Sequence, residues 1–139
     1  RDWGWAPEYV EGFYKAMKSS ETKDYIIATG KQHSVKDFII WSALALGINI
    51  EFKGVGIDEI AVVTEVSGDL CPFVDVGQVI VRIDPRYFRP TEVDLLLGDP
   101  SKAQDKLGWS HETTVRELVR EMVQSDLEIM ASSPVITGE

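Results

Sequence analysis

The sequence predicts a mixed α/β chain, which taken by itself has the pattern of an α+β fold. Two segments with apolar residues at helical spacing each begin with a capping box, at Ser34 to Asp37 and at Thr114 to Glu117. Between them lie short runs rich in Val and Ile, which Gly-rich turns separate as expected of strands. Helices that flank a group of strands favour this class over an all-helical or all-strand fold.

The composition restricts the classes of partner. The 139 residues are 44% hydrophobic, sufficient for one core, and 14 basic against 23 acidic residues give a net charge of −9. This charge excludes a general attraction to nucleic acid or to an anionic membrane, so an anionic ligand requires a local basic cluster. No apolar stretch reaches the ~18 residues of a membrane-spanning helix, and we expect a soluble, cytoplasmic protein. The single cysteine, Cys71, has no second cysteine for a disulfide or a metal motif.

The first third of the chain predicts a helix, a strand and a second helix. Pro7 suits a first helical turn, and apolar residues at helical spacing extend this helix over residues 7–18. The apolar run at residues 25–28 is typical of a buried strand. After the capping box at Ser34, an amphipathic helix is expected as far as Gly47.

The rest of the chain predicts strands followed by two helices. The strands are expected at residues 48–53, 60–66, 79–83 and 92–97. Asp99-Pro100 predicts the start of a short helix that ends at Gly108, and the second capping box begins a long helix. Residues 132–139 are expected to form a disordered tail.

Two patterns imitate motifs of cofactor-dependent enzymes. Tyr14 and Lys18 stand in Y-x-x-x-K register, one helical turn apart, where a lysine assists acid/base chemistry by a tyrosine. Because Tyr14 also belongs to the apolar face of its helix, we interpret the pair as a core residue beside a surface residue. Gly54-Val55-Gly56 lacks the third glycine of a dinucleotide-binding loop and is interpreted as a turn between strands.

The other residues with catalytic or metal-binding chemistry stand alone. His33 and His111 have no Cys or second His at metal-ligand spacing, and each is interpreted as a capping or surface residue. The acidic pair Asp58-Glu59 lies in a turn, where solvation accounts for it. The residues themselves therefore predict no catalytic group and no metal site in this chain.

Five stretches of the chain carry a resemblance to a known family. They are Arg1-Asp2-Trp3-Gly4, Asp24-Tyr25-Ile26-Ile27-Ala28-Thr29-Gly30 with Ser34-Val35, Asp84-Pro85-Arg86-Tyr87-Phe88-Arg89-Pro90-Thr91-Glu92-Val93, Gly98-Asp99-Pro100-Ser101-Lys102-Ala103 with Leu107-Gly108-Trp109, and Arg116-Glu117-Leu118-Val119-Arg120-Glu121-Met122-Val123. Their order and spacing resemble those of GDP-mannose 4,6-dehydratases, members of the extended short-chain dehydrogenase/reductase family. The resemblance covers residues 1 to about 131, and the Arg86 to Glu92 block is its most specific part.

The resemblance implies a division of labour. The chain is expected to be the C-terminal, substrate-binding part, with residues 1–30 completing the Rossmann cofactor domain and residues 31–131 forming the substrate domain. In such enzymes NADP and the catalytic Tyr, Lys, Thr and Glu belong to the larger N-terminal part, which would precede Arg1. The chain lacks an initiator Met and is expected to be an inactive fragment that binds no NADP. The intact enzyme is expected to be a homo-oligomer.

The family reaction implies a GDP-sugar as substrate. A hydride is taken from C4 of GDP-mannose, water is eliminated between C5 and C6, and the hydride returns to C6, which gives GDP-4-keto-6-deoxymannose. Such products serve as precursors of fucose and rhamnose nucleotide sugars. The part of the family to which this chain is similar is expected to hold the GDP end.

The resemblance assigns substrate binding to Arg1, Arg89 and Glu92. Arg1 is expected near the diphosphate, Arg89 on a phosphate and Glu92 on the ribose, in agreement with the forked geometry of arginine and the two acceptor oxygens of a carboxylate. Arg86 is a weaker candidate. Alternatively, Arg89 and Glu92 form an ion pair that braces a loop. Trp5 stands where many family members have a His.

Two other functions remain open from the sequence. The chain could be a stand-alone nucleotide-sugar binding module, or part of a related epimerase or dehydratase for another sugar. If it is a fragment, the first helix and the strand at residues 25–28 lack the sheet on which they would pack. A bare apolar patch, or one covered by a second copy, is therefore expected at Tyr9, Val10, Phe13, Tyr14, Met17, Ile26 and Ile27.

Overall fold

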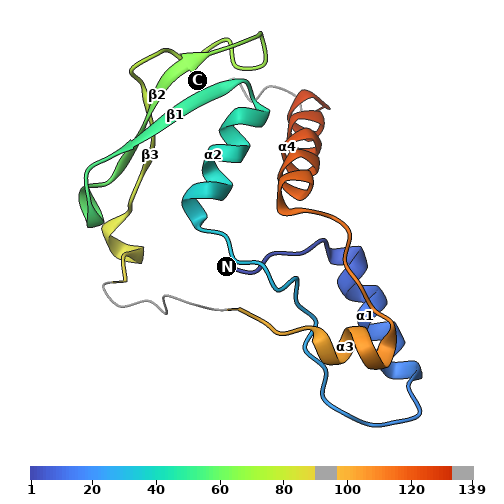
Figure 1. Ribbon diagram of the computed structural model, residues 1–139. Coiled ribbons are helices and arrows are strands. Elements are labelled where there is room, and N and C mark those ends of the chain that lie inside the picture. Colours follow the sequence, from blue (N-terminus) through green and yellow to red (C-terminus); the bar gives the residue numbers. More distant parts are fainter. Residues whose placement is uncertain (90–96, 133–139) are drawn as a thin grey trace. The chain divides into compact units, whose positions relative to one another are not determined.

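The computed structural model describes residues 1–89 and 97–132 of the chain (Figure 1). The chain divides into two compact units. Unit 1 contains the described residues of the ranges 1–38 and 93–118, and unit 2 those of the ranges 39–92 and 119–139. Within the described ranges, none of the helices is both long and apolar enough to cross a membrane.

Unit 1 contains helix α1, Ala6–Lys18, and the shorter helix α3, Ser101–Leu107, which pack against each other (Figure 1). Helix α1 begins at Ala6, one residue before the predicted start, and Pro7 lies in its first turn. Helix α3 ends at Gly108, whose φ of 59° is left-handed, a conformation that glycine adopts without a steric penalty. The local sequence signals therefore placed both helices to within one or two residues.

The centre of unit 1 is Trp109, which is 1% exposed. Its ring meets Tyr9 of α1 edge to face, with ring centroids 6.0 Å apart, and its indole N–H donates to the Glu8 carbonyl over 2.7 Å. A Cβ atom on Gly12 would lie 3.1 Å from Nε1 of Trp109, so the glycine lets the indole lie close to the helix. Trp109 is therefore part of the packed interior of unit 1.

Unit 2 contains a three-stranded antiparallel sheet in the order β1-β2-β3. Its strands are β1, Ile48–Lys53, β2, Ile60–Val66, and β3, Val79–Arg82, with bulges between Asn49 and Ile50 and between Ala61 and Val62. A small core of Ala43, Ile48 and Val63 joins the last turns of α2 to the sheet. Short 3-10 turns, η1 at Gly56–Asp58 and η2 at Pro85–Tyr87, follow β1 and β3. Three of the five predicted strands are thus confirmed, two of them with their predicted bounds.

Helix α2, Val35–Ala45, and helix α4, Val115–Ser132, begin in unit 1 and continue in unit 2. Both begin with the capping boxes read from the sequence. Ser34 Oγ accepts from the Asp37 amide over 3.0 Å, and Asp37 Oδ2 accepts from the Ser34 amide over 2.9 Å. Thr114 and Glu117 exchange the equivalent bonds over 3.3 and 2.8 Å.

One predicted strand is wrong. Residues 25–28 are described but form no strand. A strand requires a hydrogen-bonded neighbour, and within residues 1–89 and 97–132 the paired strands are β1, β2 and β3. The apolar run also predicted burial. Ala28 is indeed buried, at 6% exposed, whereas Ile26 is 56% exposed. The predicted strand at residues 92–97 lies outside the described residues except for Leu97. Of the predicted tail, Ser132 is the last residue of α4, and residues 133–139 lie outside the described part.

The apolar side chains of the first helix are largely bare. Those that are more than half exposed are Val10, Phe13, Tyr14 and Met17 of α1, together with Ile26. Tyr9 and Ile27, the other two members of the predicted patch, are partly buried. The expectation of an uncovered patch is therefore confirmed for five of the seven side chains.

Candidate functional site

An open cavity of about 470 Å³ lies within unit 1. Its lining comes from the first residues of the chain, from α1 and from two short segments: Arg1, Asp2, Trp3, Tyr9, Ile27, Ala28, Leu97 and Gly98. The wall combines one cationic side chain with a carboxylate, a phenol and aliphatic surface. A cavity of this size and mixed lining is suited to part of a small polar ligand.

Asp2 fixes the first residues of the chain against the loop at Thr29. Its Oδ1 accepts from the amide and the hydroxyl of Thr29 over 3.0 and 2.6 Å, and its Oδ2 accepts from the Gly30 amide over 3.0 Å. The His33 amide also donates to the Arg1 carbonyl over 2.8 Å. These bonds hold the backbone of Arg1 at the cavity wall, while Asp2 is occupied in holding the loop.

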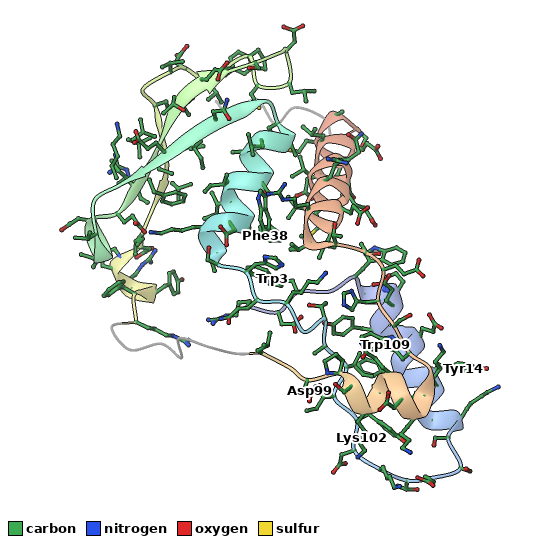
Figure 2. The ribbon with its side chains drawn as sticks, viewed as in Figure 1. Trp3, Tyr14, Phe38, Asp99, Lys102 and Trp109 are labelled. Atoms are coloured by element: carbon green, nitrogen blue, oxygen red, sulfur yellow. The ribbon has the colours of Figure 1, made fainter. Side chains whose placement is uncertain are left out.

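Two aromatic side chains, Trp3 and Tyr9, contribute to the cavity wall. Trp3 packs against Phe38 with ring centroids 5.0 Å apart and planes tilted by 56° (Figure 2). Burial, followed by the negative charges of Asp2 and Glu8, raises the pKa of Tyr9. Tyr9 therefore keeps its proton at neutral pH and offers the cavity a hydrogen-bond donor.

The predicted substrate-binding residues are found in different parts of the chain. Arg1 lines the cavity of unit 1, and Arg89 is an exposed residue of unit 2, after η2. Glu92 lies outside the described residues, so neither its proposed role nor an ion pair with Arg89 is tested. The sequence did not identify Asp2 or Tyr9, although the Arg1-Asp2-Trp3 block and the position of Tyr9 on α1 contained them.

The weaker candidate, Arg86, is engaged by its neighbour. Its Nε lies 3.1 Å from both carboxylate oxygens of Asp84, and its Nη2 lies 2.6 Å from Oδ2. The Arg86 side chain and amide donate to Asp84 and hold the pKa of that carboxyl below its ordinary value. A guanidinium whose N–H groups already donate to a carboxylate is less suited to bind a phosphate.

The patterns that imitate enzyme motifs have structural roles. The Lys18 amine lies over the face of the Tyr14 ring, 4.7 Å from its centroid, as a cation–π contact on the surface. Tyr14 is 52% exposed, so its predicted place in the core is wrong, because the face of α1 that carries it is uncovered. Gly54 and Gly56, with φ of 88° and 58°, form the turn between the antiparallel strands β1 and β2, as predicted.

The two histidines have backbone partners. The His33 amide donates to Arg1, and Nε2 of His111 lies 2.9 Å from the Thr29 carbonyl oxygen. Among the described residues, no three His, Cys, Asp or Glu side chains are grouped in a way that would hold a metal ion. The interpretation of His111 as a capping or surface residue is therefore wrong. Its side chain joins the segment after α3 to the loop at Thr29 within unit 1.

Comparison with known proteins gives the chain a family. A profile of the family described as "GDP-mannose 4,6 dehydratase" matches residues 1–122. A GDP-mannose 4,6-dehydratase of Vibrio cholerae is 52% identical over 93% of this chain and 35% of its own length. The corresponding proteins of Drosophila melanogaster and Homo sapiens are 42% and 41% identical over 97% and 96% of the chain, and over 32% and 33% of their own lengths.

The chain therefore spans about a third of the length of the curated relatives that it matches. The match extends through both units, since the profile includes α1 at one end and the first turns of α4 at the other. Identities above 40% over more than nine-tenths of the chain, together with the profile, carry the assignment. This chain belongs to the GDP-mannose 4,6-dehydratase family.

Proposed function

We propose that the intact protein converts GDP-mannose to GDP-4-keto-6-deoxymannose with NADP as its cofactor, and that this chain holds the GDP end of the substrate. The observation that carries the proposal is the 52% identity to a protein named for that activity, over 93% of the chain. The product would enter the synthesis of deoxyhexose nucleotide sugars. We also propose that the intact enzyme is a homo-oligomer located in the cytoplasm.

Three side chains hold the substrate in this account. Arg1 contacts the diphosphate, Arg89 binds a phosphate through its fork, and Glu92 accepts from the ribose hydroxyls. The position of Arg1 in the cavity wall supports its role. For Arg89, the support is that it is exposed whereas the nearby Arg86 is paired with Asp84.

NADP belongs elsewhere in the intact protein. A dinucleotide site needs a glycine-rich loop that leads from a strand into the N-terminus of a helix. The Gly54-Val55-Gly56 loop leads through the 3-10 turn η1 into strand β2, so these residues do not fit the cofactor. This chain contributes substrate-binding residues, and the cofactor and the acid/base groups come from the remaining part of the protein.

The bare face of α1 has a place in this proposal. Residues 1–30 complete the cofactor domain and residues 31–131 form the substrate domain. In the intact protein, residues 25–28 then gain a neighbouring strand, and Val10, Phe13 and Met17 are covered by the cofactor domain. The exposure of these three side chains, between 54% and 77%, is consistent with a surface that is normally covered.

The proposed role of Arg89 is tested by steady-state kinetics of the intact protein. Arg89→Ala removes a charge-assisted contact and should weaken GDP-mannose binding by about 1.5 to 3 kcal/mol, seen as a raised KM. Arg86→Ala is the matched control, since the paired Arg86 should change KM much less. An unchanged KM in Arg89→Ala would contradict the substrate-binding role and favour the alternative, in which Arg89 braces a loop.

A further inference from the structure

A carboxylate stands beside the proposed phosphate-binding arginine in the cavity wall. Arg1 and Asp2 are consecutive residues, and both line the cavity of unit 1. A negative charge repels an anionic ligand at short range, so this neighbour would by its charge alone weaken the binding of a diphosphate. An acidic residue at this place in a site for an anion therefore calls for an explanation.

The Asp2 carboxylate is engaged by the loop that follows residues 25–28. Its Oδ1 accepts from the hydroxyl and the amide of Thr29 over 2.6 and 3.0 Å, and its Oδ2 accepts from the Gly30 amide over 3.0 Å. Gly30 has a left-handed φ of 70°, which glycine adopts without a steric penalty. Hydrogen bonds to an ionised acceptor are stronger than those between neutral groups, so the charge of Asp2 serves to hold this loop.

The same loop holds the backbone of Arg1. The His33 amide donates to the Arg1 carbonyl over 2.8 Å, and the Arg1 nitrogen donates to the His33 carbonyl over 2.5 Å. Between these two attachments, the Lys31 amide donates to the Thr29 hydroxyl oxygen over 3.2 Å and braces the loop. Residues 29–33 therefore bind two consecutive residues of the cavity wall and fix the point from which the Arg1 side chain leaves the backbone.

The loop is itself anchored within unit 1. Thr29 is 9% exposed, and its carbonyl oxygen lies 2.9 Å from Nε2 of His111. Just before the loop, a Cβ atom on Gly98 would lie 2.4 Å from the Cβ of Ala28, so these two residues of the cavity wall are in close contact. A support that is packed on both sides can hold a binding group in one geometry.

We propose that Asp2 is a positioning residue for Arg1: it binds the loop at residues 29–33, and the loop fixes the backbone from which the Arg1 guanidinium reaches the diphosphate of the substrate. This inference rests on the proposed function, because it takes a nucleoside diphosphate as the ligand. Asp2 does not contact the ligand and acts through its neighbour. Order that is already present before binding lowers the entropic cost of binding, and this gain outweighs the repulsion between the carboxylate and the diphosphate.

The direction in which one substitution changes affinity separates this role from a purely electrostatic one. Asp2→Asn removes the negative charge and keeps the size of the side chain. If Asp2 acted through its charge alone, the intact protein would bind GDP more tightly after the substitution. If Asp2 positions Arg1, binding weakens, and we expect the Kd for GDP to rise about 10-fold, the order of one charge-assisted hydrogen bond. Calorimetric titration of the intact protein with GDP measures this change.

A double-mutant cycle shows whether Asp2 acts through Arg1. In the Arg1→Ala variant the guanidinium is absent, so adding Asp2→Asn should change the Kd by less than about 2-fold. In turnover of GDP-mannose, Asp2→Asn should raise KM and retain most of kcat. Glu117→Gln is the matched control. Its carboxylate accepts from the amide and the hydroxyl of Thr114 over 2.8 and 2.7 Å and does not line the cavity, so the Kd should stay unchanged.

Unchanged or tighter GDP binding in Asp2→Asn, together with weakened binding in Arg1→Ala, would overturn the inference and leave the proposed function standing. An equal effect of Asp2→Asn with and without Arg1 would also overturn it. Unchanged binding in Arg1→Ala would overturn the proposed role of Arg1 and the inference with it. If Asp2→Asn does not fold, Thr29→Val takes its place in the cycle. This variant removes the hydroxyl that donates to Asp2, and the Kd should again rise only when Arg1 is present.

Discussion

The indole N–H of Trp109 donates to the backbone carbonyl of Glu8 over 2.7 Å, across 101 positions of sequence. This bond ties the segment after α3 to the first turn of α1. The same turn carries the Glu8 carboxylate, which binds the amides of Glu112 and Thr113. Backbone and side chain of one residue thus hold residues 109–113 against α1, which forms part of the cavity wall through Tyr9.

Removing Trp109 should open unit 1. Because the ring is 1% exposed, Trp109→Ala should destabilise the packing of α1 by about 3 to 5 kcal/mol. Trp109→Phe keeps a ring but loses the bond to Glu8 and should cost less, about 1 kcal/mol for the hydrogen bond alone, with any cavity adding to this. The measurement is hydrogen exchange of the α1 amides in the intact protein. Phe73→Ala, at a side chain that is 91% exposed, is the control and should change little.

Asp2 should matter for the cavity through the loop that it holds. Asp2→Asn leaves one acceptor oxygen where the carboxylate used two, so at least one of the bonds to Thr29 and Gly30 is lost. We expect a loss of about 1 to 3 kcal/mol in the stability of this loop. The Thr29 and Gly30 amides should exchange faster in the variant. Unchanged exchange would show that Asp2 does not hold the loop.

The start of α2 should weaken in acid. The side-chain and backbone hydrogen bonds from Ser34 are the main causes that lower the pKa of Asp37, ahead of a small opposing effect of burial. A lowered pKa in the native state means that the contribution of Asp37 is present above its unfolded pKa, about 3.9, and is lost as the pH falls through the native value. NMR titration of the carboxyl group should show the lowered pKa. Ser34→Ala should move it back toward the ordinary value.

The exposed face of α1 should make the isolated 139-residue chain self-associate. Phe13 and Met17, which are 54% and 77% exposed, are the side chains to change. Sedimentation of the chain should show concentration-dependent association, and the double variant Phe13→Glu with Met17→Glu should reduce it. A single monomeric species at all concentrations would favour a self-sufficient binding module.

Local chemistry made much of the fold predictable. Capping boxes depend on residues three positions apart, so Ser34 with Asp37 and Thr114 with Glu117 marked their helices in the sequence itself. Strands β1 and β2 were recognisable because Gly54 and Gly56 separate two runs that contain β-branched residues. Both glycines have a positive φ in the turn. Residues 25–28 have a similar pattern, but a strand also needs a partner, and the sequence of the run does not show whether one is present.

The candidate site was only partly predictable for a related reason. The resemblance identified Arg1, and the structure places it in the cavity wall. The contacts of Asp2 with Thr29 and of Glu8 with Thr113 join residues 27 and 105 positions apart, and no spacing rule connects such pairs. The sequence shows that Glu8 lies in the first turn of α1. An acidic residue at this position is usually explained by its favourable interaction with the helix dipole, which does not indicate the contact with Thr113.

The central claim is that this chain is the GDP-sugar binding part of a GDP-mannose 4,6-dehydratase. The most direct test is a turnover assay of the intact protein with NADP, in which GDP-mannose is compared with UDP- and dTDP-linked sugars. The account predicts GDP-4-keto-6-deoxymannose from GDP-mannose, no product from the other sugars, and no turnover by the isolated 139-residue chain. Consumption of a UDP- or dTDP-sugar in place of GDP-mannose, or turnover by the isolated chain, would contradict it.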